Sequence, residues 1–159
     1  MNKPPLKTKK IGLSRRGYRR CKQGYYSCKN PKKYVGDINA VIYRSGLELI
    51  AFRFLDLNQN VHRWGAEIIT VPYFDKASMK QRTYYLDLYV EFVNKNNKLS
   101  KSIIEIKPYN QTKPPAKRGK NFDKRNSDYI TNMSKWQAAT QFAQKNGMEF
   151  HILTEKHLR

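Results

Sequence analysis

Three charged residues stand inside two short apolar segments, and their types and spacing could bind a metal ion. Residues 84–90 contain Asp87, and residues 102–107 contain Glu105 and Lys107. Side chains alternate along a strand, so Glu105 and Lys107 point to one face, about 6–7 Å apart. A carboxylate is costly to bury without a partner. Two acids on adjacent strands beside a lysine therefore predict a divalent-cation site, and oxygen ligands favour Mg²⁺ or Mn²⁺.

Each candidate acid also has a purely structural interpretation. Asp87, Glu105 and Lys107 could form a cross-strand charge cluster on a solvated face. Glu48 lies three residues after Ser45, which is the spacing of a capping box at the start of a helix. The functional alternative for Glu48 is a third carboxylate at the metal site. The two interpretations of Glu48 are compatible.

The elements that position these residues follow from periodicity and turn signals. Apolar residues with helical spacing predict a helix over 47–55: Leu47, Ile50, Ala51, Phe54 and Leu55. Strands are predicted over 61–73, 84–90 and 102–107, and the last two form a hairpin around a polar turn at 94–100. Pro72 favours an edge or the end of its strand. A second helix over 129–145, capped by Ser127 or Asp128, and a strand over 148–153 complete the order.

Charge is unevenly distributed along the chain of 159 residues, whose net charge is +20. Residues 1–35 hold 12 basic residues and no acid, which predicts a basic N-terminal arm before a domain over 36–159. Such a balance indicates a polyanion partner, and we expect DNA. The expected contacts are Arg15, Arg16, Arg19 and Arg20 in the arm and Lys113, Lys117 and Arg118 in a later loop. The alternative is a solvated tail and a flexible solvated loop.

Several function classes do not fit this sequence. No apolar run is long enough to span a bilayer, and the first residues lack the apolar segment of a signal peptide, so we expect no membrane partner and an intracellular origin. Cys21 and Cys28 have no neighbouring histidine, which favours free thiols over a zinc site. The three histidines are scattered, and we assign them no role.

With Asp87, then Glu105-Ile106-Lys107, and Glu48 on a preceding helix, the chain resembles the PD-(D/E)xK nuclease superfamily. The resemblance implies an α/β restriction-endonuclease-like core (αβββαβ), a mixed sheet flanked by helices. It implies that Glu48, Asp87, Glu105 and Lys107 are catalytic and that the three acids bind Mg²⁺ or Mn²⁺. Leu86 stands where the superfamily motif has proline, a position that varies widely.

A closer resemblance covers roughly residues 30–158. The segments Asn30-Pro31-Lys32-Lys33-Tyr34, Tyr43-Arg44-Ser45, Gln111-Thr112-Lys113-Pro114-Pro115 and Lys135-Trp136 resemble the head completion nucleases of T4-like bacteriophages. That group is itself similar to the N-terminal domain of the TnsA endonuclease. The resemblance implies a DNA endonuclease that trims packaged DNA ends in the cytoplasm of an infected host or in the virion neck. Phage portal or neck proteins would be its partners.

Two other function classes remain open at the level of sequence. One is a non-catalytic DNA-binding protein of the phage neck, and the other is a TnsA-like transposon or repair nuclease outside a phage. A full set of four site residues favours an active enzyme. Lys107 is expected to contact the scissile phosphate and orient the attacking water, and Lys135 and Gln137 are weaker candidates for the edge of the site.

Overall fold

The computed structural model describes residues 23–158. Its α-helices are α1 (Gly46–Leu57) and α2 (Phe122–Lys145). The strands are β1 (Gly24–Tyr25), β2 (Ile42–Tyr43), β3 (Val61–Ala66), β4 (Thr70–Asp75), β5 (Lys80–Tyr85), β6 (Leu88–Val93), β7 (Leu99–Ile106) and β8 (Glu149–Leu153). Three short 3₁₀ turns lie at Pro31–Lys33, Ile38–Ala40 and Tyr109–Gln111. The protein is therefore mixed α/β, as the sequence predicts.

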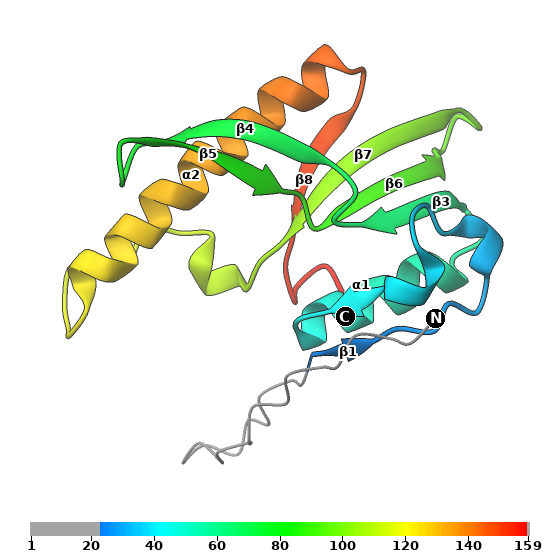
Figure 1. The fold of residues 1–159 in the computed structure, drawn as a ribbon, viewed down its shortest axis with the longest axis horizontal. Coiled ribbons are helices and arrows are strands. Elements are labelled where there is room, and N and C mark those ends of the chain that lie inside the picture. The colour runs from blue at the N-terminus through cyan, green and yellow to red at the C-terminus, as the bar shows by residue number, and fades with distance from the viewer. Residues whose placement is uncertain (1–22, 159) are drawn as a thin grey trace.

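A four-stranded mixed sheet forms the centre of the molecule, in the order β3-β6-β7-β8 (Figure 1). The β3/β6 and β6/β7 pairs are antiparallel, and β7/β8 is parallel. The β6/β7 pair is the predicted hairpin around the polar turn. β7 has a neighbouring strand on each side, and an apolar core covers each face of its second half, so Ser102 to Ile106 are buried.

The two faces of this sheet support separate apolar cores. Helix α1 covers one face, where Phe52 packs against Trp64 on β3 with ring centroids 5.2 Å apart. Ile104 and Ile106 belong to this core, as the alternation of β7 predicts. On the other face, Ile103 packs with the buried residues of β4, β5 and α2. Figure 1 shows α1 and α2 on opposite sides of the sheet.

The predicted strands over 61–73 and 84–90 are wrong in one respect, because each is interrupted. The first splits into β3 and β4, with Glu67 at a positive φ of 52° in the break. The second splits into β5 and β6, so Asp87 lies between two strands. The reason is that β4 and β5 pair only with each other and leave the sheet as a two-stranded ribbon. Pro72 is tolerated there because both strands of the ribbon are edges.

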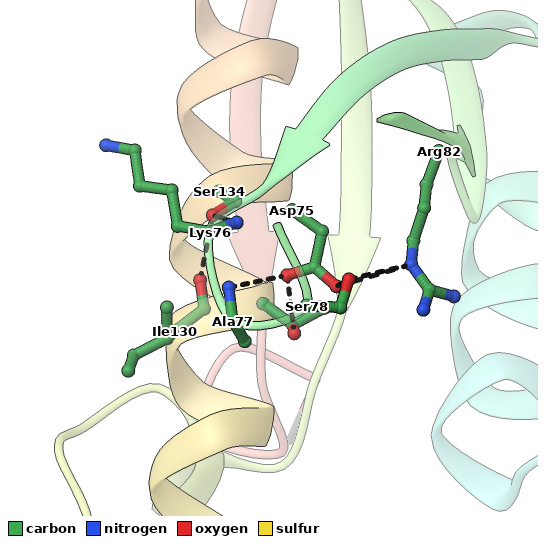
Figure 2. Close-up of polar contacts among 8 residues, drawn as sticks. Asp75, Lys76, Ala77, Ser78, Arg82, Ile130 and Ser134 are labelled. Atoms are coloured by element: carbon green, nitrogen blue, oxygen red, sulfur yellow. Dashed lines mark hydrogen bonds and ion pairs between the residues drawn. The ribbon is translucent and has the colours of Figure 1, made fainter. Parts of the chain in front are cut away.

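A buried carboxylate fastens the far end of this ribbon to α2. Asp75, 3% exposed, accepts hydrogen bonds from the Ala77 amide (3.1 Å), the Ser78 hydroxyl (2.6 Å) and the Thr131 hydroxyl on α2 (2.9 Å). Arg82 forms an ion pair with it at 3.3 Å. Figure 2 shows these contacts together with Ser134 of α2, which accepts from the Lys76 amide at 3.2 Å. These contacts, which we call the Asp75 clasp, fix the turn of the ribbon to α2.

Both helices differ in detail from the sequence prediction. Ile50 and Phe54, predicted in the apolar face of α1, are 45% and 56% exposed, whereas Phe52 is buried. The reason is that α1 turns Phe52 toward Trp64 and Tyr26. Helix α2 begins at Phe122 rather than near Tyr129. The residue before it, Asn121, has a left-handed backbone conformation, and the right-handed helix starts directly after it. The predicted caps, Ser127 and Asp128, therefore lie inside the helix.

Residues 23–35, the end of the predicted basic arm, pack against the body of the domain. Buried Asp56 at the end of α1 accepts from the Tyr26 hydroxyl (2.8 Å) and from the backbone amides of Lys29 (2.6 Å) and Asn30 (3.0 Å). Cys28 is a free thiol beside this core, and burial raises its pKa to about 11. The rest of the predicted arm, with Cys21, lies outside the described residues, so the domain boundary at residue 35 stays a prediction.

Neither α1 nor α2 is suited to crossing a bilayer. Within residues 23–158, no helix combines the length and the apolar character that a membrane span requires.

Candidate active site

The register of the central hairpin brings Asp87 and Glu105 together. Leu88 pairs with Ile104, so one step further along the antiparallel pair Asp87 stands opposite Glu105. Opposed residues in such a pair have Cβ atoms about 4.5–5.5 Å apart. A hydrogen bond from the Ile106 amide to Asp87 Oδ2 (2.7 Å) fixes the Asp87 side chain against β7. The two carboxylates predicted from sequence therefore do meet.

Glu105 is buried and has a different partner on each oxygen. Its Oε2 accepts from the Tyr84 hydroxyl at 2.6 Å, and its Oε1 forms an ion pair with Lys107 Nζ at 2.7 Å. The Glu105 side chain is 4% exposed and that of Lys107 19%. The ion pair confirms that Glu105 and Lys107 share one face of the strand. It also shows that the cluster is buried rather than solvated.

Electrostatics sets Asp87 apart from its neighbours. Burial, and after it the nearby charge of Glu105, raise the pKa of Asp87 to about 8 against the opposing effect of the Ile106 amide. Glu105 has Lys107 as a counter-charge, whereas the partners of Asp87 are the Ile106 amide and the carboxyl group of Glu105 itself. A proton or a cation beside Asp87 would relieve the repulsion between the two carboxylates. The pair thus fits a hard divalent cation, which proteins commonly bind through one or two carboxylates.

Glu48 occupies a cap at the start of α1. Its carboxylate accepts from the Arg44 amide (2.7 Å) and from the Ser45 hydroxyl (2.9 Å), and Ser45 Oγ accepts from the Glu48 amide (3.2 Å). The capping role predicted from sequence is confirmed. Glu48 is also near enough that its charge contributes to the raised pKa of Asp87. Among residues 23–158, however, no three acidic, histidine or cysteine side chains form a ready-made metal cage.

Two residues at the edge of the site are Tyr84, on β5, and Lys135, on α2. Lys135 Nζ lies 5.3 Å from the centre of the Tyr84 ring, so the helix places a second cation near Glu105. Gln137 turns away and accepts from Lys76 Nζ at 3.4 Å. Tyr84 was not predicted as a site residue. Its position three residues before Asp87 was the one sequence feature that could have indicated it, but the contact of its hydroxyl with Glu105 depends on the geometry of the ribbon.

The predicted DNA contacts fall into two groups. Lys113, Lys117 and Arg118 are exposed in the loop that follows Lys107. Lys113 Nζ lies 4.6 Å from the centre of the Tyr109 ring, and Lys156 Nζ lies 3.2 Å from it. These lysines lower the pKa of Tyr109. The arm residues Arg15, Arg16, Arg19 and Arg20 lie outside the part of the chain that the structure describes.

Comparison with known proteins places this arrangement in a family. Residues 58–155, which include β3 to β8 and hence Asp87, Glu105 and Lys107, match the family model described as TnsA-like endonuclease N terminal. The chain belongs to the TnsA-like endonuclease family. It is also 37% identical over 143 residues to the head completion nuclease of Enterobacteria phage T4, across 86% of this chain and 93% of that protein. No solved structure gave a significant match.

Proposed function

We propose that this protein is a metal-dependent DNA endonuclease that hydrolyses phosphodiester bonds. The observation that carries the proposal is the pairing of Asp87 with Glu105 at the end of β7, with Lys107 on the same face. The T4 relative is named a nuclease and the family model an endonuclease, which supports this chemistry. The order α1, β3, β6, β7, α2, β8, with the ribbon inserted before β6, supports a restriction-endonuclease-like core.

Asp87 and Glu105 would hold Mg²⁺ or Mn²⁺. Such an ion would activate water and offset the charge that builds up on the phosphate. Tyr84 fixes one oxygen of Glu105, so the carboxylate keeps its orientation when DNA binds. Glu48 holds its place through the cap and adds negative charge near Asp87. Whether Glu48 is a third ligand is an outcome of metal titration of the Glu48→Gln variant.

Lys107 would exchange its partner during the reaction. In the structure its ammonium is bound to Glu105 at 2.7 Å and is partly exposed. A cation held by Glu105 would compete with this ion pair and free Lys107 for the scissile phosphate. There it would orient the attacking water and stabilise the developing charge.

The test of the activity is direct. Purified protein is incubated with single-stranded, duplex and branched DNA in Mg²⁺ and in EDTA. We expect cleavage only with the metal, no cleavage by Asp87→Asn or Glu105→Gln, and unchanged or tighter DNA binding by both variants, because these acids repel phosphate. The control variant is Asp123→Asn, an exposed acid in the first turn of α2. Wild-type cleavage rates in either site variant would exclude this site.

The biological role that we propose is trimming of packaged DNA ends during phage head completion. A protruding DNA end would obstruct proteins that seat at the same opening, and portal or neck proteins would be the neighbours of this nuclease. We expect a phage with the Asp87→Asn change to make filled heads that fail to join tails. If that phage is fully infectious, the role is a non-catalytic one in the neck.

A further inference from the structure

A cavity of about 440 Å³ lies between the loop that follows β7 and the first half of α2. Its lining residues are Asn110, Gln111, Lys113, Pro114, Pro115, Ala116, Arg125, Asp128, Tyr129 and Asn132. Neither Asp87, Glu105 nor Lys107 lines it, so the chemistry proposed above leaves the cavity unexplained. Its volume is in the range of pockets that bind small molecules or parts of larger ones.

Both walls of the cavity continue into the active site. On the helix wall, the lining residues end at Asn132, and Lys135 follows three residues later on the same side of the helix, about 4.5 Å further along its axis. Lys135 lies over the ring of Tyr84, whose hydroxyl binds Glu105. On the loop wall, Asn110 follows Lys107 by three residues. The cavity is therefore the next space along the surface from the candidate catalytic residues.

Hydrogen bonds hold the loop wall in place against the helix. Arg125 Nη2 donates to the backbone carbonyls of Arg118 (2.9 Å) and Ala116 (3.4 Å). Within the loop, Thr112 donates from its hydroxyl to the Tyr109 carbonyl at 2.7 Å. The guanidinium of Arg125 is thus used in joining the two walls, and the cavity is formed before any ligand arrives.

The lining chemistry matches a nucleotide. Tyr129 offers an aromatic ring, and aromatic rings are the usual stacking platform for an unpaired base. Lys113 in the cavity and Lys135 beyond it offer cations for the phosphates on either side. Asn132 and Asp128 offer groups that can accept from, or donate to, the edge of a base. The carboxylate of Asp128 also disfavours a phosphate beside it, which leaves the base as the group to lie against this part of the lining.

We propose that this cavity binds one unpaired nucleotide next to the phosphate that is cut. The inference rests on the proposed function and names its substrate class: single-stranded DNA, or duplex with a frayed or overhanging end. A closed duplex would have to flip a nucleotide out of its stack to fill the cavity, which costs free energy. The enzyme therefore favours ends over the interior of a duplex.

Binding without cleavage tests the proposal. The full-length protein is titrated in EDTA with a short single-stranded oligonucleotide that contains 2-aminopurine, whose fluorescence reports stacking, and with a duplex closed by hairpins at both ends. Two variants address the cavity: Tyr129→Ala removes the ring, and Ala116→Trp fills the space without removing a polar group. Gln141→Ala, an exposed residue on the same helix outside the cavity, is the matched control.

We expect both cavity variants to bind the single strand about tenfold more weakly and to lose the fluorescence change, while the control binds like the wild type. Affinity for the closed duplex should change by less than twofold. Unchanged single-strand affinity in Ala116→Trp would overturn the proposal even if Tyr129→Ala folds poorly. The result is independent of catalysis, because failure of the nuclease proposal would appear as absent cleavage of every DNA form in Mg²⁺.

Discussion

At the scale of single residues, the site is defined by the contrast between two carboxylates one register step beyond the last β6/β7 pair. Glu105 has a hydroxyl and an ammonium as partners, whereas Asp87 has one amide and the carboxyl group of Glu105. The pKa of Asp87 is accordingly raised to about 8 from an ordinary value of 3.8, and burial is the largest cause. This asymmetry makes Asp87 the residue at which a proton and the proposed metal ion would compete.

The stability of the metal-free protein should therefore depend on pH through Asp87. The folded state holds this proton more tightly than the unfolded state, so the free energy of unfolding should fall as pH rises from about 4 to 8 and then level off. Asp87 contributes at most about 1.4 kcal/mol per pH unit. Urea unfolding in EDTA at several pH values should show a shallower slope for Asp87→Asn. Equal slopes for variant and wild type would contradict the raised pKa, and Asp37→Asn, an exposed 3₁₀ cap, serves as the control.

Removal of the Lys107 ammonium should separate metal binding from catalysis. In Lys107→Met the side chain keeps its length, and Tyr84 still holds Glu105. We expect cleavage to slow by about 100-fold, as for loss of one transition-state donor, with Mg²⁺ affinity, measured by calorimetry, equal to or higher than that of the wild type. A parallel loss of Mg²⁺ binding would mean that Lys107 only supports the carboxylates.

At the scale of elements, the ribbon and α2 act on the site together. The Asp75 clasp holds the end of β4 against α2 (Figure 2). Tyr84 on β5, the partner strand of β4, lies under Lys135 of α2 and donates to Glu105. Hydrogen bonding from Ser78 is the main reason that the pKa of Asp75 lies below its ordinary value. The stability that Asp75 provides is present above its ordinary pKa of about 4 and is lost as pH falls below it.

Loosening this clasp should disturb the site from a distance. We expect Asp75→Asn to speed amide hydrogen exchange in β4 and β5 and to slow DNA cleavage, while exchange in β7 changes little. Hydrogen-exchange mass spectrometry and cleavage assays on the same protein measure both effects. Wild-type exchange in the ribbon together with slow cleavage would indicate that Asp75 acts by another route.

The sequence predicts those elements whose pattern lies in neighbouring residues, and it does not predict those that depend on contacts between residues far apart in the chain. The capping box at Ser45, the alternation in β7 and the turn before it are local patterns, and all three are confirmed. The run of residues 84–90 is apolar on both sides of Asp87, so periodicity gave no sign that the chain leaves one sheet and enters another at Leu86. The exposed Ile50 and Phe54 show the same limit, since the burial of Phe52 depends on Trp64, distant in sequence.

At the scale of the whole molecule, the middle of the sequence is nearly neutral and the basic residues are concentrated outside it. Residues 36–106 contain 9 basic and 8 acidic residues, whereas residues 1–22 contain 9 basic residues and no acid. The exposed lysines of the loop after Lys107 add to this balance near the site. Phosphate contacts of this kind position DNA without reading its sequence. We therefore expect low sequence preference.

Deletion of residues 1–22 should weaken DNA binding without unfolding the domain, because the packed segment begins at the residues around Tyr26. If about four phosphate contacts are lost, the slope of log affinity against log salt should become shallower by about 3–4. Filter binding at several salt concentrations measures the slope, and circular dichroism checks folding. An unchanged slope would mean that these residues bind another protein instead of DNA.

Two short backbone links connect the ribbon to the sheet, one between β3 and β4 and one between β5 and β6. Its outer part can therefore lengthen or shrink without changing the register of any strand in the four-stranded sheet. Selection on the tip of the ribbon is therefore separate from selection on the β6/β7 register, which places Asp87 opposite Glu105. The protein can adapt this part of its surface to a new neighbour in one lineage while Asp87 and Glu105 stay opposite each other.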